Sequence, residues 1–341
     1  SGNYNPYEFK QKNNYAQYGS AQIGGTDKGH SLGLNLHMDW TLSSSLTLSA
    51  KLGRFTLKDE TDPTDATTPL VSDRLWYYPG TTSLLMGLNT NDDGTTYVPN
   101  PTANASLYAL ATAYNRGGYG SYTALDKIVK DQARADLSYF VGNHAFKFGL
   151  SYMTSEYTEI SKQTGDAGTW LLAASSPMGF YARQTLYTQD ATVKASYQAA
   201  YLQDTWEILP GLRASLGVRF EAQKQEDADG KTFLEFKWGD AIQPRLGFIW
   251  DPANDGRTKW SLSFARYYEQ IPQRMAMRQR GHEVFLRTWY QLTAYSRTGI
   301  GTLDTVPLNE VDYATPFSAV PITEDLKLPR RDEIIAGWDH T

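Results

Sequence analysis

The most regular hydrophobic pattern of the chain lies in the segment 201–268, where apolar and polar residues alternate. Leu216, Val218 and Phe220 share one parity in this segment, and the arginine Arg219 takes the other. A period of two residues is typical of a β-strand that has one apolar and one polar face. The neighbouring runs repeat the pattern after a turn, which predicts antiparallel strands.

The same alternation recurs along most of the chain and predicts nine strands. We expect them near 30–41, 45–57, 128–140, 144–156, 196–208, 211–222, 241–250, 258–268 and 331–340. Short turns and long connections alternate between these strands, and the long outer loops are expected at 58–126, 153–195 and 269–330. Short turns on one side and long loops on the other are the plan of a transmembrane β-barrel. We therefore predict an all-β fold, an antiparallel transmembrane barrel with long extracellular loops.

Two places interrupt the alternation. Phe55 and Leu57 change parity at the end of their strand, which indicates a bulge or the exit from the membrane. Asp204 shares its parity with Leu202 and Trp206. A carboxylate that faces lipid at mid-depth costs on the order of 2 kcal/mol or more. We therefore expect Asp204 to lie near the inner interface or beyond a bulge.

Five segments of the connections have patterns of their own. The run PQRMAMRQRG (272–281) begins with proline and ends with glycine, which predicts a short helix. The run ANASLYALATAYN (103–115) is also compatible with a helix. The uncharged run TWLLAASSPMGFYA (169–182) is either buried among the loops or an exposed binding patch, and we favour burial. The acidic run NDDGTT (91–96), like EDADGKT (226–232), lacks the full ligand series of a calcium loop and is interpreted as a polar turn.

Composition changes this picture only in part. Hydrophobic residues make up 40% of the 341 residues and the mean hydropathy is −0.50, values that are typical of a soluble protein. A membrane barrel has the same average, because its lipid-facing residues occupy every second position only. Aromatic residues make up 13%, which suits the two membrane interfaces. The absence of cysteine excludes a disulfide scaffold, and the net charge of −5 argues against nucleic acid as a partner.

Four segments carry a resemblance to a known family. The runs AYLQDTW, LGVRFE, QPRLGFIWDP and KWSLSFARYYEQIP, in this order and at this spacing, resemble the barrel of TonB-dependent outer-membrane receptors, in particular the Oar-like branch. The resemblance implies a location in the bacterial outer membrane and a barrel of about 22 strands. Neither the plug domain nor the last strands of such receptors has a counterpart in this sequence, so we expect a partial barrel.

The same resemblance implies a function. Receptors of this family bind a scarce substrate at their outer loops and import it with energy from the inner membrane, through a TonB-type energy-coupling protein that acts on the plug. We therefore expect this partner, an unknown substrate, and outer-membrane lipid and lipopolysaccharide around the barrel. Two alternatives remain: a passive porin or adhesion-type outer-membrane barrel, and a secreted carbohydrate-binding β-sandwich.

Candidate site residues fall into two sets. Charged residues of the polar parity are expected to face the lumen or a plug; they are Arg134, Asp136, Lys147, Arg213, Arg219, Glu221 and Arg245. A basic and aromatic run in the third long loop faces solvent, lipopolysaccharide or substrate and is the candidate for ligand binding; it comprises Arg274, Arg278, Arg280, Arg287, Trp289 and Tyr290. The chain contains none of the common hydrolase or metalloprotease motifs, and its five histidines lack metal-site spacing. We thus expect neither an enzyme nor a metal or other cofactor.

Overall fold

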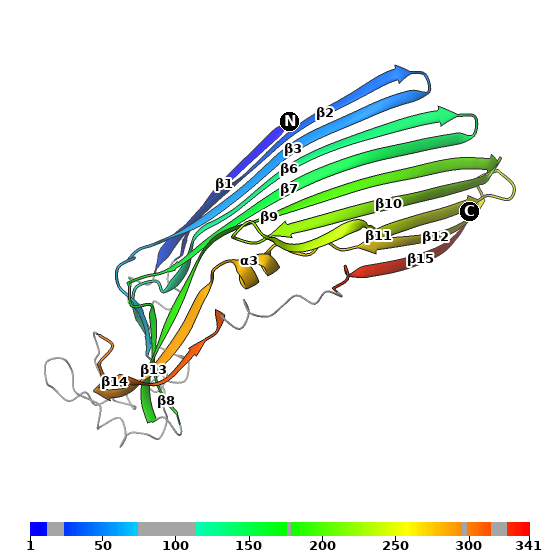
Figure 1. Cartoon of the computed structure of the whole chain (residues 1–341). Helices are drawn as coiled ribbons and strands as arrows, with labels where there is room; N and C mark the ends of the chain where they lie inside the picture. Colours follow the sequence, from blue (N-terminus) through cyan, green and yellow to red (C-terminus); the bar gives the residue numbers. More distant parts are fainter. Residues whose placement is uncertain (12–23, 74–113, 176–178, 295–298, 315–325) are drawn as a thin grey trace.

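One large curved sheet dominates the structure, a computed structural model that describes residues 1–11, 24–73, 114–175, 179–294, 299–314 and 326–341 (Figure 1). Along its main path the strands lie in the order β1-β2-β3-β6-β7-β9-β10-β11-β12-β15, and all neighbours are antiparallel. The strands are β1 (Gly2–Gln11), β2 (Gly25–Ser43), β3 (Leu46–Pro63), β6 (Ser121–Val141), β7 (His144–Gln163), β9 (Gly179–Leu209), β10 (Leu212–Glu226), β11 (Thr232–Trp250), β12 (Thr258–Tyr268) and β15 (Arg330–His340). The edges of this path are β1 and β15, so the described sheet is open. The predicted all-β antiparallel fold is confirmed.

The two faces of the sheet differ in chemistry along every long strand. Register places Leu48, Leu137, Phe148 and Leu202 directly opposite one another on β3, β6, β7 and β9. We call this side the outer face. It exposes large apolar side chains, for example 66% of Leu36. A soluble protein rarely exposes a continuous apolar band of this kind. The opposite, inner face carries the polar parity and is the side on which helix α3 (Arg274–Arg280) packs.

Tight turns close the strand pairs at one end of the sheet. Residues 44–45, 142–143 and 210–211 are two-residue turns, and 251–257 is a slightly longer one. Gly142 and Gly211 have φ values of 55° and 80° in these turns. Glycine takes up such left-handed conformations without the steric penalty that a Cβ atom brings. At the other end most connections are long, although residues 227–231 join β10 and β11 directly, and this makes that end the extracellular one in a membrane barrel.

The strands extend beyond the residues that the alternation predicted. β3, β6, β7 and β9 continue well past the apolar band, into segments that we expected to be loops. A second group of strands lies there: β4 (Leu70–Asp73), β5 (Tyr114–Gly117), β8 (Thr169–Ser175), β13 (Val284–Ala294) and β14 (Thr302–Asp312). Outside the membrane the two faces of a strand no longer meet lipid on one side and the lumen on the other, so these strands have no period-two apolar signal. The edge strand β1 lacks the signal for the same reason.

The two interruptions of the pattern have different causes. No register shift separates Leu52 from Leu57 in β3, so Phe55 and Leu57 mark the exit from the membrane and not a bulge. Asp204 stays on the outer face, opposite Phe146 and Leu216, and no bulge turns it away. Its carboxylate lies 2.7 Å from Nδ1 of His144, whose ring stacks on Phe146 and Trp206. Asp204 therefore lies near the short turns, as one of the two expectations had it, and the contact with His144 satisfies its carboxylate there without a bulge.

The second group of strands has its own small core. Val71, Trp170, Leu172, Ala182 and Leu292 form a buried cluster between β4, β8, β9 and β13. The described part of the uncharged run 169–182 is thus buried, as we favoured. The predicted helix at 103–115 lies almost entirely outside the described residues, and so does the acidic run 91–96. Within the described ranges, no helix is both long and apolar enough to span a membrane.

A pair of substitutions on β2 tests the assignment of the two faces. Met38→Arg should destabilise the protein by roughly 2–4 kcal/mol, because Met38 lies in the middle of the apolar band of the outer face, between Leu36 and Trp40. Asn35→Arg, three residues away on the inner face, should have little effect. Urea-induced unfolding in lipid vesicles measures both changes, and equal penalties would contradict the assignment.

Candidate functional site

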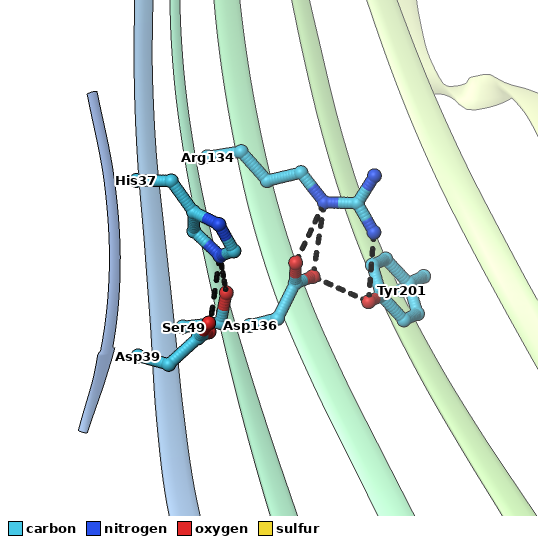
Figure 2. Close-up of polar contacts among 6 residues, drawn as sticks. All are labelled: His37, Asp39, Ser49, Arg134, Asp136 and Tyr201. Atoms are coloured by element: carbon cyan, nitrogen blue, oxygen red, sulfur yellow. Dashed lines mark hydrogen bonds and ion pairs between the residues drawn. The ribbon is translucent and has the colours of Figure 1, made fainter. Parts of the chain in front are cut away.

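A hydrogen-bonded network on the inner face links strands that are far apart in sequence. The Nε atom of Arg134 donates to both carboxylate oxygens of Asp136, at 3.0 and 2.8 Å. Its terminal nitrogen donates to the Tyr201 hydroxyl at 3.2 Å, and that hydroxyl donates to Asp136 (Figure 2). Asp136 is only 6% exposed. Its charge is therefore held by an arginine and a phenol from β6 and β9.

Gly149 makes this network possible. In the register of β6, β7 and β9 it lies directly between Asp136 and Tyr201. A Cβ atom at this position would overlap both the Tyr201 ring and the Asp136 carboxylate. Because glycine leaves the strand surface open, the tyrosine ring crosses β7 and reaches the aspartate.

Neighbouring strands continue the polar wall. His37 on β2 lies 3.0 Å from the Asp39 carboxylate and 3.1 Å from the Ser49 hydroxyl (Figure 2). On β10, Arg219 donates to Glu221 at 2.6 Å. On β11, the Arg245 guanidinium lies 5.1 Å from the centre of the Tyr267 ring. The polar parity thus forms a polar wall from β2 to β12, with charged side chains on most of its strands.

A groove of about 510 Å³ runs along this wall. Among its lining residues are Arg134, Lys147, Arg219 and Arg245, with Tyr201 and Tyr267. Of the seven residues predicted to face the lumen, these four basic ones share the groove. Asp136 and Glu221 pair with two of them, whereas Arg213 lies nearer the short turns, opposite Glu207. The groove therefore presents several basic side chains, which suit contact with an anionic surface or ligand.

Residues 269–282, which we call the inner strap, lie on the inner face beyond this groove. The strap contains helix α3, as predicted from its proline and glycine. Ala276 and Met277 are fully buried against Tyr157 and Val193. Ile271 packs with Leu234, Phe236 and Ala241. The strap therefore covers the inner face of β7, β9, β10 and β11.

Four glutamine amides attach the strap to the wall. Gln223 accepts from the Ile271 amide at 3.2 Å and donates to its carbonyl at 3.1 Å. Gln225 donates to the same carbonyl, and Gln189 donates to that of Met277 at 2.9 Å. Gln273 of the strap donates to the Ser155 carbonyl at 2.9 Å and accepts from its hydroxyl at 2.6 Å. Buried amides with these partners satisfy the backbone of the strap, which has no strand beside it.

A row of carboxylates lies beside the strap. Asp59, Asp126 and Glu159 are directly opposite one another on β3, β6 and β7. The Tyr157 hydroxyl donates to Glu159 at 2.7 Å, and the Ser161 hydroxyl does so at 3.2 Å. Burial raises the pKa of Asp126, and the charges of Glu159 and Asp59 raise it further. Burial also raises the pKa of Tyr157, with the hydrogen bond to Glu159 as the next cause.

The structure separates the residues that the sequence predicted to bind ligand. Arg274 lies on α3, where its charge acts on Asp126 and Tyr157. Arg278, also on α3, contacts the Tyr187 hydroxyl at 3.0 Å and the buried Glu283 carboxylate at 2.6 Å. Burial and the Glu283 charge raise the pKa of Tyr187 to about 12. Arg280 ends the helix, and its carbonyl accepts a hydrogen bond from Ala228.

The rest of that set lies on β13. The Arg287 guanidinium lies 4.9 Å from the centres of both the Phe285 and Tyr313 rings. Trp289 takes the same side of the strand as Arg287, since they are two residues apart. Tyr290 takes the other side and packs on Trp170 at the small core. Arg278 and Arg287 are therefore connected through Tyr187 and Phe285, whose rings are 5.7 Å apart, while the partly buried Tyr290 packs against the small core.

Sequence reasoning missed Tyr201 and the glutamine amides of the wall. The sequence does contain a weak signal for the glutamines, because Gln223 and Gln225 continue the polar parity of β10 beyond its apolar band. No group of three or more acidic or histidine residues in the described ranges could hold a metal ion. In the turn 226–232, the Asp227 side chain accepts hydrogen bonds from the backbone amides of Asp229 and Lys231, which is the arrangement of a polar turn.

The sequence pattern of a known family matches residues 1–237, and the description of that family is "Outer membrane beta barrel domain". The chain belongs to this family. It is accordingly an outer-membrane protein, and the predictions of a bacterial outer-membrane location and of an outer-membrane barrel fold are confirmed. The apolar outer face is the lipid-facing side of such a barrel. The membrane-spanning segments are the parts of the strands between the short turns and about Leu52, Ala133 and Tyr152.

Two known proteins that are similar to this chain are outer-membrane transporters, in agreement with the resemblance to TonB-dependent receptors. The TonB-dependent transporter Oar of Myxococcus xanthus is 31% identical over 182 residues, which are 47% of this chain and 17% of that protein. The crystal structure of the outer membrane transporter YddB from Escherichia coli aligns with a TM-score of 0.52 at 13% identity, over 85% of this chain and 35% of that one. At 13% identity, the similarity to YddB shows the fold alone. The chain spans well under half the length of both proteins.

Gly149→Ala tests the inner network. The substitution should destabilise the protein by about 1–3 kcal/mol, because the methyl group displaces the Tyr201 ring from Asp136. Gly247→Ala is the matched control on the same face, since its Cβ atom would lie 3.7 Å from that of Ser215. The control should change stability by less than about 0.5 kcal/mol. Equal stability of both variants in urea titrations would exclude the role assigned to Gly149.

Asp126→Asn tests the carboxylate row. Because the pKa of Asp126 is raised, the folded protein favours the protonated carboxyl of this residue. The contribution of Asp126 to stability is therefore fully present below the ordinary pKa of an aspartate and is lost as the pH rises through the raised pKa. At about pH 8 the variant should be more stable by roughly 0.5–1 kcal/mol, and at about pH 3.5 the difference should vanish. Thermal unfolding in detergent measures both. Glu156→Gln, on the outer face of β7, should give no gain at the higher pH.

Proposed function

We propose that this chain forms part of the wall of a TonB-dependent receptor, which binds a substrate at its extracellular end and imports it with inner-membrane energy. The observation that carries the proposal is the polar wall on the inner face, with its charged side chains, from His37 to Tyr267. Its four groove cations and buried Asp136 suit contact with a folded, charged domain in the lumen. The likeness to the transporter Oar supports the same function.

In this proposal the lumen-facing residues contact a plug. Arg134, Lys147, Arg219 and Arg245 supply cations for acidic groups on the plug surface, whereas Asp136 and Glu221 keep two of these cations in place. A TonB-type energy-coupling protein acts on the plug from the periplasm. Substrate contacts come from the extracellular end, where Arg274, Arg278, Arg280, Arg287 and Trp289 lie on the strap and β13.

A passive outer-membrane porin is the alternative with the same strand pattern. The strap favours the receptor, because it covers one side of the lumen with a buried apolar contact and four amide anchors. The carbohydrate-binding β-sandwich is excluded by membership in the outer-membrane barrel family, since a sandwich buries the apolar face of one sheet against a second sheet.

Depletion of compounds from the growth medium tests the function of the native protein. Mass spectrometry should find at least one compound that cells with the gene remove from the medium and that a deletion strain leaves there. The same compound should also remain in the medium when an uncoupler is added to cells with the gene. Arg287→Ala should reduce this uptake, whereas Arg257→Ala, in the turn at the opposite end, should leave it unchanged. Uptake that persists with the uncoupler would indicate the porin instead.

A further inference from the structure

A small pocket lies on the inner face at the start of the inner strap, and we call it the strap pocket. Glu269 and Gln270 of the strap line it, together with Leu328 from the segment that precedes β15. The Glu269 amide donates to the Pro329 carbonyl at 3.0 Å, which holds these two segments side by side. The pocket has a volume of about 240 Å³. Sites for drug-sized ligands have roughly 300–1,000 Å³, so the strap pocket suits a smaller molecule.

The floor of the strap pocket is one row of the sheet register. It consists of four residues that are directly opposite one another on β6, β7, β9 and β10: Arg134, Ser151, Ala199 and Glu221. Because serine and alanine have short side chains, the surface is low in the middle of the row. Arg134 and Glu221 are three strand spacings apart, which separates their Cα atoms by roughly 14 Å. A cation and a carboxylate therefore stand at opposite ends of the floor.

A second carboxylate joins Glu221 at the β10 end. It belongs to Glu269, because the strap is bonded to β10 only two residues further on, at Ile271. Arg219 also lines the pocket, and its Nε atom donates to Glu221 at 2.6 Å. One arginine balances one of the two carboxylates, so this end carries a net negative charge. It therefore favours a cationic group such as an ammonium.

Arg134 supplies hydrogen-bond donors at the β6 end. Its Nε and Nη2 atoms donate to Asp136 and Tyr201 (Figure 2). The Nη1 atom has no hydrogen-bond partner among the residues that the structure describes, and the side chain is 46% exposed. A guanidinium has five N–H donors in a planar fork. The donors of Nη1 are therefore available to a carboxylate in the pocket.

Between its two ends the pocket offers amides and apolar surface. Gln132 and Gln270 line it, and their side-chain amides form no hydrogen bond within the described ranges. A peptide group has one donor and one acceptor, which a primary amide can match. Met153, Tyr197 and Leu328 add apolar surface for a short side chain. This lining fits a peptide better than other small molecules that carry two opposite charges.

The strap pocket is reached from the lumen. It shares Arg134 and Arg219 with the groove along the polar wall. On its extracellular side the strap closes it, where Gln223 holds both the amide and the carbonyl of Ile271. A small molecule therefore enters through the groove, and a folded domain in the lumen is too large to follow.

We infer that the strap pocket binds a short zwitterionic peptide, with its carboxylate on Arg134 and its ammonium group on Glu221 and Glu269. A peptide of two or three residues spans roughly 7–10 Å when extended. This length suits the floor, because the charged side chains reach inward from both ends. A simple anion would leave the acidic end without a partner, and a simple cation would leave Arg134 without one. The inference rests on the proposed function, since it names a substrate class for the receptor.

Isothermal titration calorimetry of the full-length native protein in detergent tests the inference, with trialanine as the probe. Trialanine carries both charges at neutral pH, whereas N-acetyl-trialanine lacks the ammonium group and trialanine amide lacks the carboxylate. Each capped peptide should bind at least about tenfold more weakly than trialanine. The absence of trialanine binding, or equal binding of either capped peptide, would overturn the inference.

Variants of the pocket locate the site. Glu221→Gln/Glu269→Gln should weaken trialanine binding at least about tenfold. The control Glu156→Gln/Glu207→Gln removes the same charge from the outer face and from the end near the short turns, and it should bind like the parent protein. Ser151→Leu, which raises the floor, should abolish binding. Circular dichroism and heat-modifiable gel mobility verify that each variant is folded. Parent-like binding by folded Glu221→Gln/Glu269→Gln would contradict the inference.

Binding and uptake can fail separately in these experiments, because the calorimetric assay needs no energy source. Trialanine binding without energy-dependent uptake of any compound would count against the proposed function only. Uncoupler-sensitive uptake by a protein that does not bind trialanine would count against the strap pocket only.

Discussion

The structure depends on one constraint, which is that every backbone amide and carbonyl within a lipid bilayer must have a partner inside the protein. Antiparallel pairing meets this requirement for the strands from β3 to β12, which have a neighbour on both sides along the main path. Pairing fixes the register, and register in turn fixes which residues face lipid and which face the lumen. The apolar rows such as Leu48, Leu137 and Phe148 follow from this constraint, and so do the polar rows behind them.

The inner face shows how such a wall holds charge. Asp136 is almost fully buried, yet Arg134 and Tyr201 from two different strands satisfy its carboxylate. The network needs the open surface of Gly149, because a side chain there would block the tyrosine. Backbone pairing, the glycine and the polar network are therefore one arrangement, and a change in one of them alters the others.

Beyond the membrane, the chain satisfies its backbone in two other ways. The long strands continue and pair with β8 and β13, which build a small apolar core around Leu172 and Leu292. The inner strap, by contrast, has no strand partner and relies on buried glutamine amides such as Gln223. Both solutions bring residues of the third long connection close to the lumen, where the proposed substrate contacts lie.

The amino-acid sequence alone determined the strands within the membrane, because there the two faces meet opposite solvents and the alternation is strict. It also determined the polar parity of Arg134, Arg219 and Arg245, and the short helix of the strap. Only the tertiary structure decided how far the strands extend beyond the bilayer, since outside lipid the two faces of a strand no longer meet different solvents and leave no periodic signal. It also decided that Asp204 pairs with His144, that Tyr290 packs on Trp170, and that Tyr201 crosses Gly149 to Asp136. These contacts join residues distant in sequence, and which of them meet depends on strand register and not on the local pattern.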